Sequence, residues 1–252
     1  MRSRDEAAPR PALSPVLRQA RASKGKRGQV SVATRWRILQ LADSAFPTGG
    51  FAHSGGLEAA FHHGETRTVR QLEAYLGAHI WNLGHASLPF VAAAHDEPHR
   101  LADFDAQVDV RLLNHVANRA SRTQGRAFVS TCASVFDETG IASLFATVRA
   151  RRVCAHLAPV FGATLAILGV ERYDALALYL YLGLRASASA AIRLGIVGPH
   201  EAQRLQREMV PTLERVLGRC DAIPPLEAAT VAPLLDIMGG AHDGIYSRLF
   251  QS

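Results

Sequence analysis

Histidine and cysteine are the residues of this chain that would bind a transition metal, and their spacing indicates no closed site. Among eleven histidines, the pair His95 and His99 has a helical spacing, but Pro98 lies between them and breaks the helix that would align them. Cys154 and His156 form the closest pair of the two residue types. No His-Glu-x-x-His helix and no zinc-type spacing occurs. The sequence therefore allows at most a weak or transient metal site, built from separate helices or shared with a second chain.

A glycine-rich segment between residues 48 and 56 has residues for binding phosphate or for nucleophilic catalysis. Its two Gly-Gly pairs precede a predicted helix, which is the setting of an anion site. A P-loop is excluded, because its motif is absent and no lysine follows Lys26. Ser54 lacks the Gly-x-Ser-x-Gly spacing and the preceding strand that a nucleophile elbow requires. We therefore expect a tight turn with positive φ, Ser54 as a helix cap, and a protein that is not an enzyme.

The last eleven residues have the composition of a binding surface. Aromatic, basic and aliphatic side chains stand together in residues 242–252, at a position that frays in most domains. Tyr246, Leu249 and Phe250 would be the apolar anchors of this segment. Arg248 would be the charged anchor, since Tyr and Arg are enriched among binding hot spots. In the alternative interpretation, Leu249 and Phe250 pack back onto their own domain.

A stripe of arginines is a second candidate surface. Arg119, Arg122 and Arg126 recur at spacings of three and four residues, so they share one face of a predicted helix. One interpretation is a solvated surface. The other is a docking face for acidic or phosphate-bearing partners.

Charge is distributed unevenly along the 252 residues. Residues 1–35 hold nine basic and two acidic residues (+7), whereas residues 36–252 hold 19 arginines and 20 acidic residues (−1). A nucleic-acid-binding domain carries its basic face on the fold itself, so nucleic acid is not the expected partner. Three widely spaced cysteines are typical of free thiols in a reducing cytosol. The longest apolar run, about ten residues, is too short to cross a bilayer, and we expect a cytoplasmic protein without a membrane anchor.

Helical periodicity places these residues on an all-α fold. Residues 1–33 are predicted to be a disordered basic tail, and residues 34–252 a single helical domain. Thr34 is the expected cap of the first helix, and Thr68 with Gln71 has the pattern of a capping box. Further helices are expected within residues 101–136 (two helices), 141–151, 159–168, 173–194, 199–217 and 231–238.

Two uncommon segments resemble the UreF family of urease accessory proteins. The opening motif of that family matches at Pro47, Gly49, Gly50, Phe51, Ser54, Gly56, Leu57 and Glu58. Its closing motif matches at His242, Tyr246, Ser247, Arg248, Leu249, Phe250 and Ser252. Weaker matches between them include Ser121, Gly125, Phe161, Gly162 and Arg193. The resemblance covers about residues 36–252, and it departs at His53, where many members have an aromatic residue, and at Thr123, where an arginine is frequent.

The resemblance implies an all-α, non-catalytic chaperone that helps to assemble the nickel centre of urease. Its partners would be a UreD-type scaffold (also called UreH), a UreG-type GTPase and the urease apoprotein, and the chain itself would form homodimers. No cofactor would be bound tightly: nickel would be cargo, and GTP would bind the partner GTPase. We hypothesise that nickel passes Glu58 or His156, because carboxylate and imidazole are suitable transient ligands.

Two other classes of function compete with this interpretation. One is an all-α nucleic-acid-binding regulator that uses the basic residues 1–33. The other is a helical enzyme built on His53 and Ser54. The first predicts duplex binding that weakens steeply with salt, and the second predicts turnover by the isolated chain.

Overall fold

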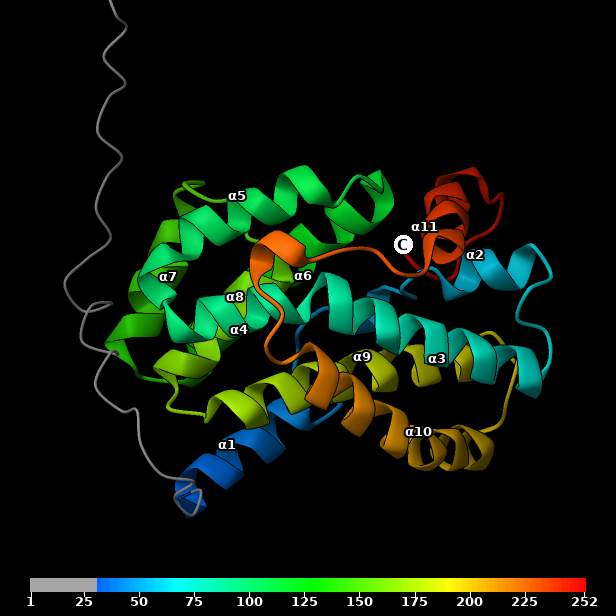
Figure 1. Cartoon of the computed structure of the whole chain (residues 1–252), viewed down its shortest axis with the longest axis horizontal. Helices are drawn as coiled ribbons and strands as arrows, with labels where there is room; N and C mark the ends of the chain where they lie inside the picture. Colours follow the sequence, from blue (N-terminus) through cyan, green and yellow to red (C-terminus); the bar gives the residue numbers. More distant parts are fainter. Residues whose placement is uncertain (1–30) are drawn as a thin grey trace, which may run out of the picture.

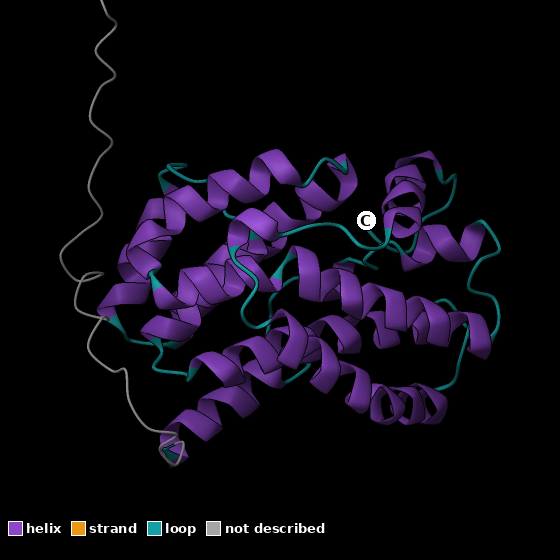
Figure 2. Ribbon diagram, viewed as in Figure 1, coloured by secondary structure: helices purple, strands orange, loops and turns teal. Residues whose placement is uncertain are grey.

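The part of the chain that the structure describes, residues 31–252 of a computed structural model, consists of α-helices, 3-10 turns and loops without a β-strand (Figure 2). This confirms the predicted all-α class. The predicted tail, residues 1–33, falls almost entirely outside the described residues. The α-helices, in chain order, are α1 (Val32–Ala42), α2 (Leu57–His62), α3 (Val69–Ala86), α4 (Leu88–Asp96), α5 (Leu101–Arg111), α6 (His115–Val135), α7 (Thr139–Arg149), α8 (Leu157–Ile167), α9 (Arg172–Arg193), α10 (Pro199–Cys220) and α11 (Pro233–Gly240).

Local capping chemistry sets several of these helix ends. The Thr68 hydroxyl accepts from the Gln71 amide, and the Gln71 side chain accepts in return from the Thr68 amide, so the predicted capping box at the start of α3 is confirmed. Asn114 caps α6 and separates it from α5, as two helices within 101–136 require. The expected cap Thr34 is wrong: Ser31 caps α1, because the helix begins two residues before Thr34.

The core is centred on α8, which packs against α4 and α6. Eight of its eleven residues are buried, so this helix is apolar on all sides, as expected of a central helix. On the opposite side of the molecule, α3, α9 and α10 pack against one another, and α1 rests on α9 (Figure 1). The helix α9 is long and apolar enough to cross a membrane by composition, but 56% of its most apolar window is buried inside this fold.

Small residues allow the close approach of α8 to its neighbours. A Cβ built on Gly162 would lie 2.1 Å from the carbonyl oxygen of Val91 in α4, a contact that a backbone group cannot relieve by rotating. The same distance separates a Cβ on Gly125 in α6 from the carbonyl oxygen of Ala155. Both glycines match the UreF-type pattern. A side chain is excluded at each position because a helix or a loop packs directly on the glycine backbone.

Gly162→Ala is expected to lower the free energy of unfolding by about 2 kcal/mol, because the added methyl group forces α4 and α8 apart. Gly77→Ala is the matched control: it also lies inside a helix, but its Cβ would meet nothing within 4 Å. That variant should gain about 0.5–1 kcal/mol from helix propensity alone. Urea denaturation of the two variants measures both effects, and equal stabilities would show that the α4–α8 contact is not close.

The C-terminal residues return to the start of the folded region. After α11, the chain runs past α2, and its last residues contact the segment just before that helix (Figure 1). The two segments that carry the most specific sequence motifs therefore meet in space, through hydrogen bonds between residues 191 and 198 positions apart.

Candidate functional site

Glu58, in the first turn of α2, joins that helix to the C-terminal segment, residues 242–252. Its side chain is fully buried. It accepts hydrogen bonds from His242 Nε2 at 2.8 Å and from the backbone amides of Leu249 at 2.6 Å and Phe250 at 3.3 Å. Three donors compensate for the cost of burying a carboxylate. Glu58 is thus occupied by the chain itself, whereas the sequence suggested it as a nickel ligand.

A second set of hydrogen bonds holds the last two residues of the chain. The Gln251 amide donates to the carbonyl oxygen of Ala52 at 2.8 Å. The main-chain oxygen of Ser252 accepts from the amide of Ser54 at 2.5 Å and from its hydroxyl at 2.9 Å. The Ser252 hydroxyl lies 2.5 Å from Nδ1 of His53. His53 and Ser54, which a helical enzyme would use as base and nucleophile, are buried and hydrogen-bonded to the C-terminal segment.

Arg193, at the end of α9, holds the same two segments together from the other side. Its guanidinium carbon lies 4.0 Å from the ring centres of both Phe51 and Phe250. Its Nη1 donates to the carbonyl oxygen of Phe51 at 2.5 Å, and its Nη2 donates to that of Leu249 at 3.1 Å. The sequence indicated Arg193 only through its family match, because nothing in its local pattern predicts partners more than 50 residues away.

The glycine-rich segment adopts the turn that its composition predicts. Gly49, Gly55 and Gly56 have φ values of 72°, 66° and 93°, which confirms the expectation of positive φ. A Cβ on Gly56 would also lie 3.4 Å from the Cα of Gly239 in α11, so the turn packs closely on that helix. Ser54 is not the N-cap of α2: the cap is Gly56, although the Ser54 hydroxyl accepts weakly, at 3.4 Å, from a first-turn amide.

The remaining residues of the opening motif have structural positions. Leu57 is fully buried in the core. Pro47 is exposed, and its carbonyl oxygen accepts from the hydroxyl of Thr131 in α6 at 2.7 Å. Gly50 opens the 3-10 turn Gly50–Ala52. These residues shape the turn against which the C-terminal segment packs.

Two histidines near the contact between the C-terminal segment and the turn before α2 are biased toward the neutral form. Burial lowers the pKa of His53, and the positive charges of Arg119 and His242 lower it further. Burial lowers the pKa of His79, stacked on Tyr75, to about 4. The lowered pKa values of these two groups favour neutral imidazoles, as expected of buried histidines in a structural interface.

The predicted anchors of the C-terminal segment divide into exposed and buried residues. Tyr246 is completely exposed, and Leu249 is 59% exposed. Phe250 is only 5% exposed, because it packs on its own domain against Arg193. Arg248 lies at the surface, with Nη1 3.3 Å from the carboxylate of Asp243. The outer side of this segment presents tyrosine, leucine and arginine side chains.

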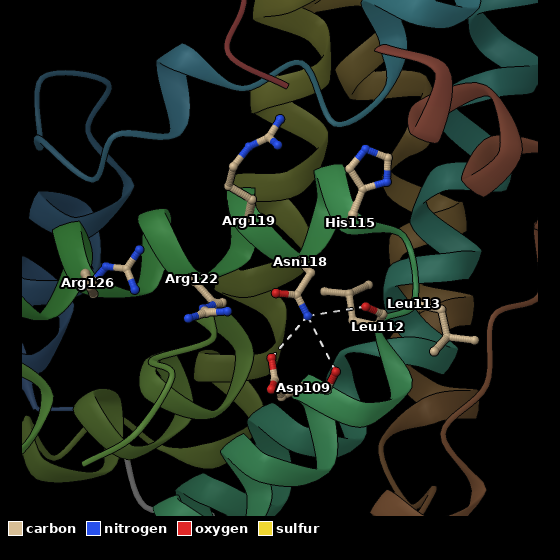
Figure 3. A pocket seen from close by; sticks show the side chains of 8 residues that line it. All are labelled: Asp109, Leu112, Leu113, His115, Asn118, Arg119, Arg122 and Arg126. Atoms are coloured by element: carbon tan, nitrogen blue, oxygen red, sulfur yellow. Dashed lines mark hydrogen bonds between the residues drawn. The ribbon is translucent and has the colours of Figure 1, made fainter. Parts of the chain in front are cut away.

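The three arginines of α6 line one surface depression of about 620 Å³, as their common helix face predicts (Figure 3). Arg119 forms an ion pair with Asp243, with Nη2 2.8 Å from the carboxylate, which raises the pKa of Arg119 and lowers that of Asp243. Arg126 donates to the carbonyl oxygen of Cys154 at 3.3 Å. Since Arg119 and Arg248 contact the same carboxylate, the depression lies next to the C-terminal segment.

The loop before α8 is held by the buried carboxylate of Asp105 in α5. Asp105 accepts from the amides of Cys154 at 2.6 Å, Ala155 at 3.2 Å and His156 at 2.7 Å. Ala155 has a φ of 67°, a strained value for a residue with a side chain. This carboxylate thus fixes the backbone from which the Cys154 and His156 side chains project.

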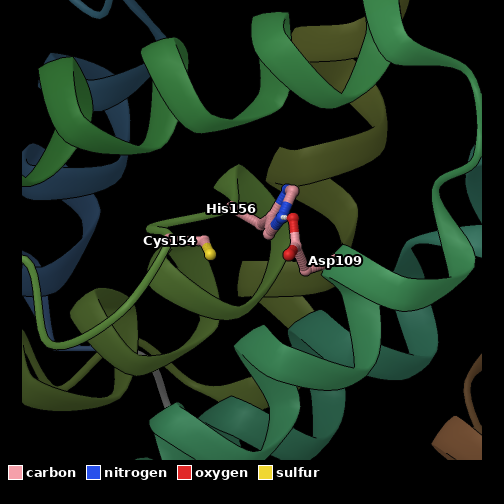
Figure 4. Close-up of side chains that lie close together, drawn as sticks. All are labelled: Asp109, Cys154 and His156. Atoms are coloured by element: carbon pink, nitrogen blue, oxygen red, sulfur yellow. Dashed lines mark hydrogen bonds and ion pairs between the residues drawn. The ribbon is translucent and has the colours of Figure 1, made fainter.

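His156 is fully buried and points toward Asp109 (Figure 4). Its Nε2 donates to the Asp109 carboxylate at 3.0 Å, and its Nδ1 lies 3.2 Å from the hydroxyl of Ser121. The hydrogen bonds from His156 and then Asn118 hold the pKa of Asp109 below its usual range. Burial raises the pKa of the Cys154 thiol, and the charges of nearby carboxylates raise it further.

Comparison with known proteins gives a consistent result. The UreF family model matches residues 66–210. Urease accessory protein F of Arabidopsis thaliana is 37% identical over 231 residues, which cover 89% of this chain and 95% of that protein. Urease accessory protein UreF of Mycobacterium tuberculosis (strain H37Rv) is 32% identical over 216 residues, covering 85% and 97% of the two chains. The chain therefore belongs to the UreF family of urease accessory proteins.

Proposed function

We propose that this protein is a non-catalytic chaperone for assembly of the urease nickel centre. It would act on the urease apoprotein together with a UreD/UreH-type accessory protein and a UreG-type GTPase. Membership of the UreF family supports the role. The observation that carries the proposal is the form of the C-terminal segment, whose inner side is anchored on Glu58 while Tyr246 and Leu249 face outward. A rigidly held apolar surface binds a partner at a lower entropic cost than a free tail.

Nickel in this proposal is cargo, and GTP belongs to the partner. The sequence contains no P-loop, so nucleotide chemistry falls to the GTPase. We further propose that the complex acts in the cytoplasm, in keeping with the free thiols of all three cysteines.

A homodimer is part of the same proposal. The helix α1 exposes Trp36 and Leu39, and Leu39 also lines a shallow apolar depression between α1 and α9. Large exposed side chains grouped in this way favour contact with another surface. The near-neutral charge of residues 36–252 disfavours the alternative of a nucleic-acid-binding regulator.

Co-purification with the UreD/UreH-type and UreG-type proteins tests the proposal. The wild-type chain should form a stable complex, and the double variant Tyr246→Ala/Leu249→Ala should weaken it at least tenfold, because both side chains are exposed anchors. The backbone amide of Leu249 still reaches Glu58 in this variant, so the fold should persist.

A matched control removes the same side-chain types elsewhere. Tyr173 and Leu226 are 60% and 78% exposed, and Tyr173→Ala/Leu226→Ala should bind partners like the wild type. Failure of the wild-type chain to form any complex would contradict the proposed function. A complex that survives loss of Tyr246 and Leu249 would move the interface to the α6 arginines, where Arg122→Ala/Arg126→Ala tests it.

A further inference from the structure

We propose that Asp109, Cys154 and His156 form a three-ligand site for a transition-metal ion, which is Ni²⁺ if the proposed function holds. The inference deepens that function by placing one binding site for the nickel cargo on this chain. One carboxylate oxygen, the thiol sulfur and a ring nitrogen lie within 4.8 Å of one another (Figure 4). They come from α5 and from the loop before α8, which are 45 residues or more apart in sequence.

The three donor atoms lie within 4.8 Å of one another, so they must shift to bind a single ion. Donors bound tetrahedrally at about 2.0–2.3 Å lie about 3.3–3.8 Å from one another. The Asp109 oxygen and His156 Nε2 are 3.0 Å apart. Asp109 must therefore move outward slightly and exchange its hydrogen bond from His156 for the ion. Its side chain is 37% exposed, whereas His156 is fully buried and stays in place.

The loop is organised before any ion binds. Asp105 holds three successive amides, so Cys154 and His156 project from a fixed backbone on either side of the strained Ala155. Metal-binding histidines almost always use their second nitrogen for a hydrogen bond that orients the ring. The hydroxyl of Ser121 occupies that position at Nδ1, and it also accepts from the Leu157 amide.

The chemistry of the donors selects the class of ion. Thiolate and imidazole favour nickel, zinc or copper over magnesium and calcium, which prefer oxygen. On binding, the thiol proton of Cys154 would leave to solvent. His156 would lose its proton at Nε2 and carry one at Nδ1, and this N–H would donate a hydrogen bond to the Ser121 oxygen. Three protein ligands leave further positions for water or for a ligand from a partner, as transfer of cargo requires.

The site opens toward the arginine-lined depression. Asp109 lines this depression together with Arg122 and Arg126, and Arg126 reaches the carbonyl oxygen of Cys154. A carrier with an acidic surface docked on these arginines would bring its ion next to Asp109. The arginine side chains and the proposed metal ligands of this face thus belong to one surface.

Titration of the purified full-length chain with Ni²⁺ alone tests the site. Wild type should bind one Ni²⁺ with a sulfur-to-nickel absorption band in the near ultraviolet. Cys154→Ser should lose the band and at least tenfold in affinity. Ser121→Ala should keep the band and lose about 10–100-fold in affinity, as loss of an orienting hydrogen bond does. His200→Ala, an exposed histidine outside the site, is the control and should match the wild type. Circular dichroism checks that each variant is folded.

An absence of the sulfur band in wild type, or an equal band and affinity in wild type and Cys154→Ser, would overturn the site. Urease activation in cells that lack their own UreF-type protein separates this outcome from failure of the proposed function. Equal activation by the wild type and Cys154→Ser would remove the site from the nickel route and leave the accessory role intact. A wild-type chain that binds Ni²⁺ through sulfur but activates no urease would retain the site and refute the role.

Discussion

Glu58→Gln should release the C-terminal segment from α2 and lower the free energy of unfolding by about 3 kcal/mol. The glutamate is fully buried, and its two oxygens accept from one imidazole and two backbone amides. Glutamine offers one acceptor oxygen, and its NH₂ group would face a donor that has no other partner. Hydrogen exchange should show the loss, with the amides of Leu249 and Phe250 exchanging far faster than in the wild type.

Glu65→Gln is the control for this prediction. Glu65 follows α2 and is exposed, so the same chemical change should alter the stability by less than about 0.5 kcal/mol. Unchanged protection of the Leu249 amide in Glu58→Gln would mean that Arg193 and Ser54 hold the segment without the carboxylate. A released segment should also lower partner binding, since Tyr246 and Leu249 would no longer be presented on a fixed backbone.

Asp105→Asn is expected to destabilise the protein by about 2–3 kcal/mol and to increase the mobility of the loop before α8. The carboxylate accepts from three consecutive amides, and the strained φ of Ala155 persists only while these bonds hold it. An asparagine NH₂ group would meet an amide N–H that has lost its acceptor. The Cys154 thiol should then react faster with a thiol reagent under native conditions.

Asp103→Asn is the matched control on the same helix. Asp103 is 42% exposed and forms an ion pair with Arg100 at 3.6 Å, a surface interaction worth at most about 1 kcal/mol. Urea denaturation and the rate of thiol modification compare the two variants. Equal reactivity of Cys154 in Asp105→Asn and in the wild type would show that the loop does not depend on the carboxylate.

The amino-acid sequence by itself determined those features that depend on neighbouring residues. The capping box at Thr68, the break at Pro98 and the positive φ of Gly49 are local consequences of a hydroxyl, a missing N–H and a missing side chain. The helical class follows from periodicity for the same reason. Even here the neighbouring alternatives compete, since Ser31 and Gly56 are the caps where Thr34 and Ser54 were expected.

Only the tertiary structure decided what the charged residues of the motifs do. Glu58 and His156 are chemically equal to many metal ligands, but Glu58 is enclosed by donors 184 or more residues away, whereas His156 faces Asp109 near a surface depression. Phe250 is buried and Leu249 exposed, although they are adjacent, because one faces Arg193 and the other faces outward. A sequence pattern specifies residue types and local geometry, whereas burial and long-range partners arise from how the helices pack. Packing therefore buries the carboxylate of Glu58 and leaves that of Asp109 partly exposed.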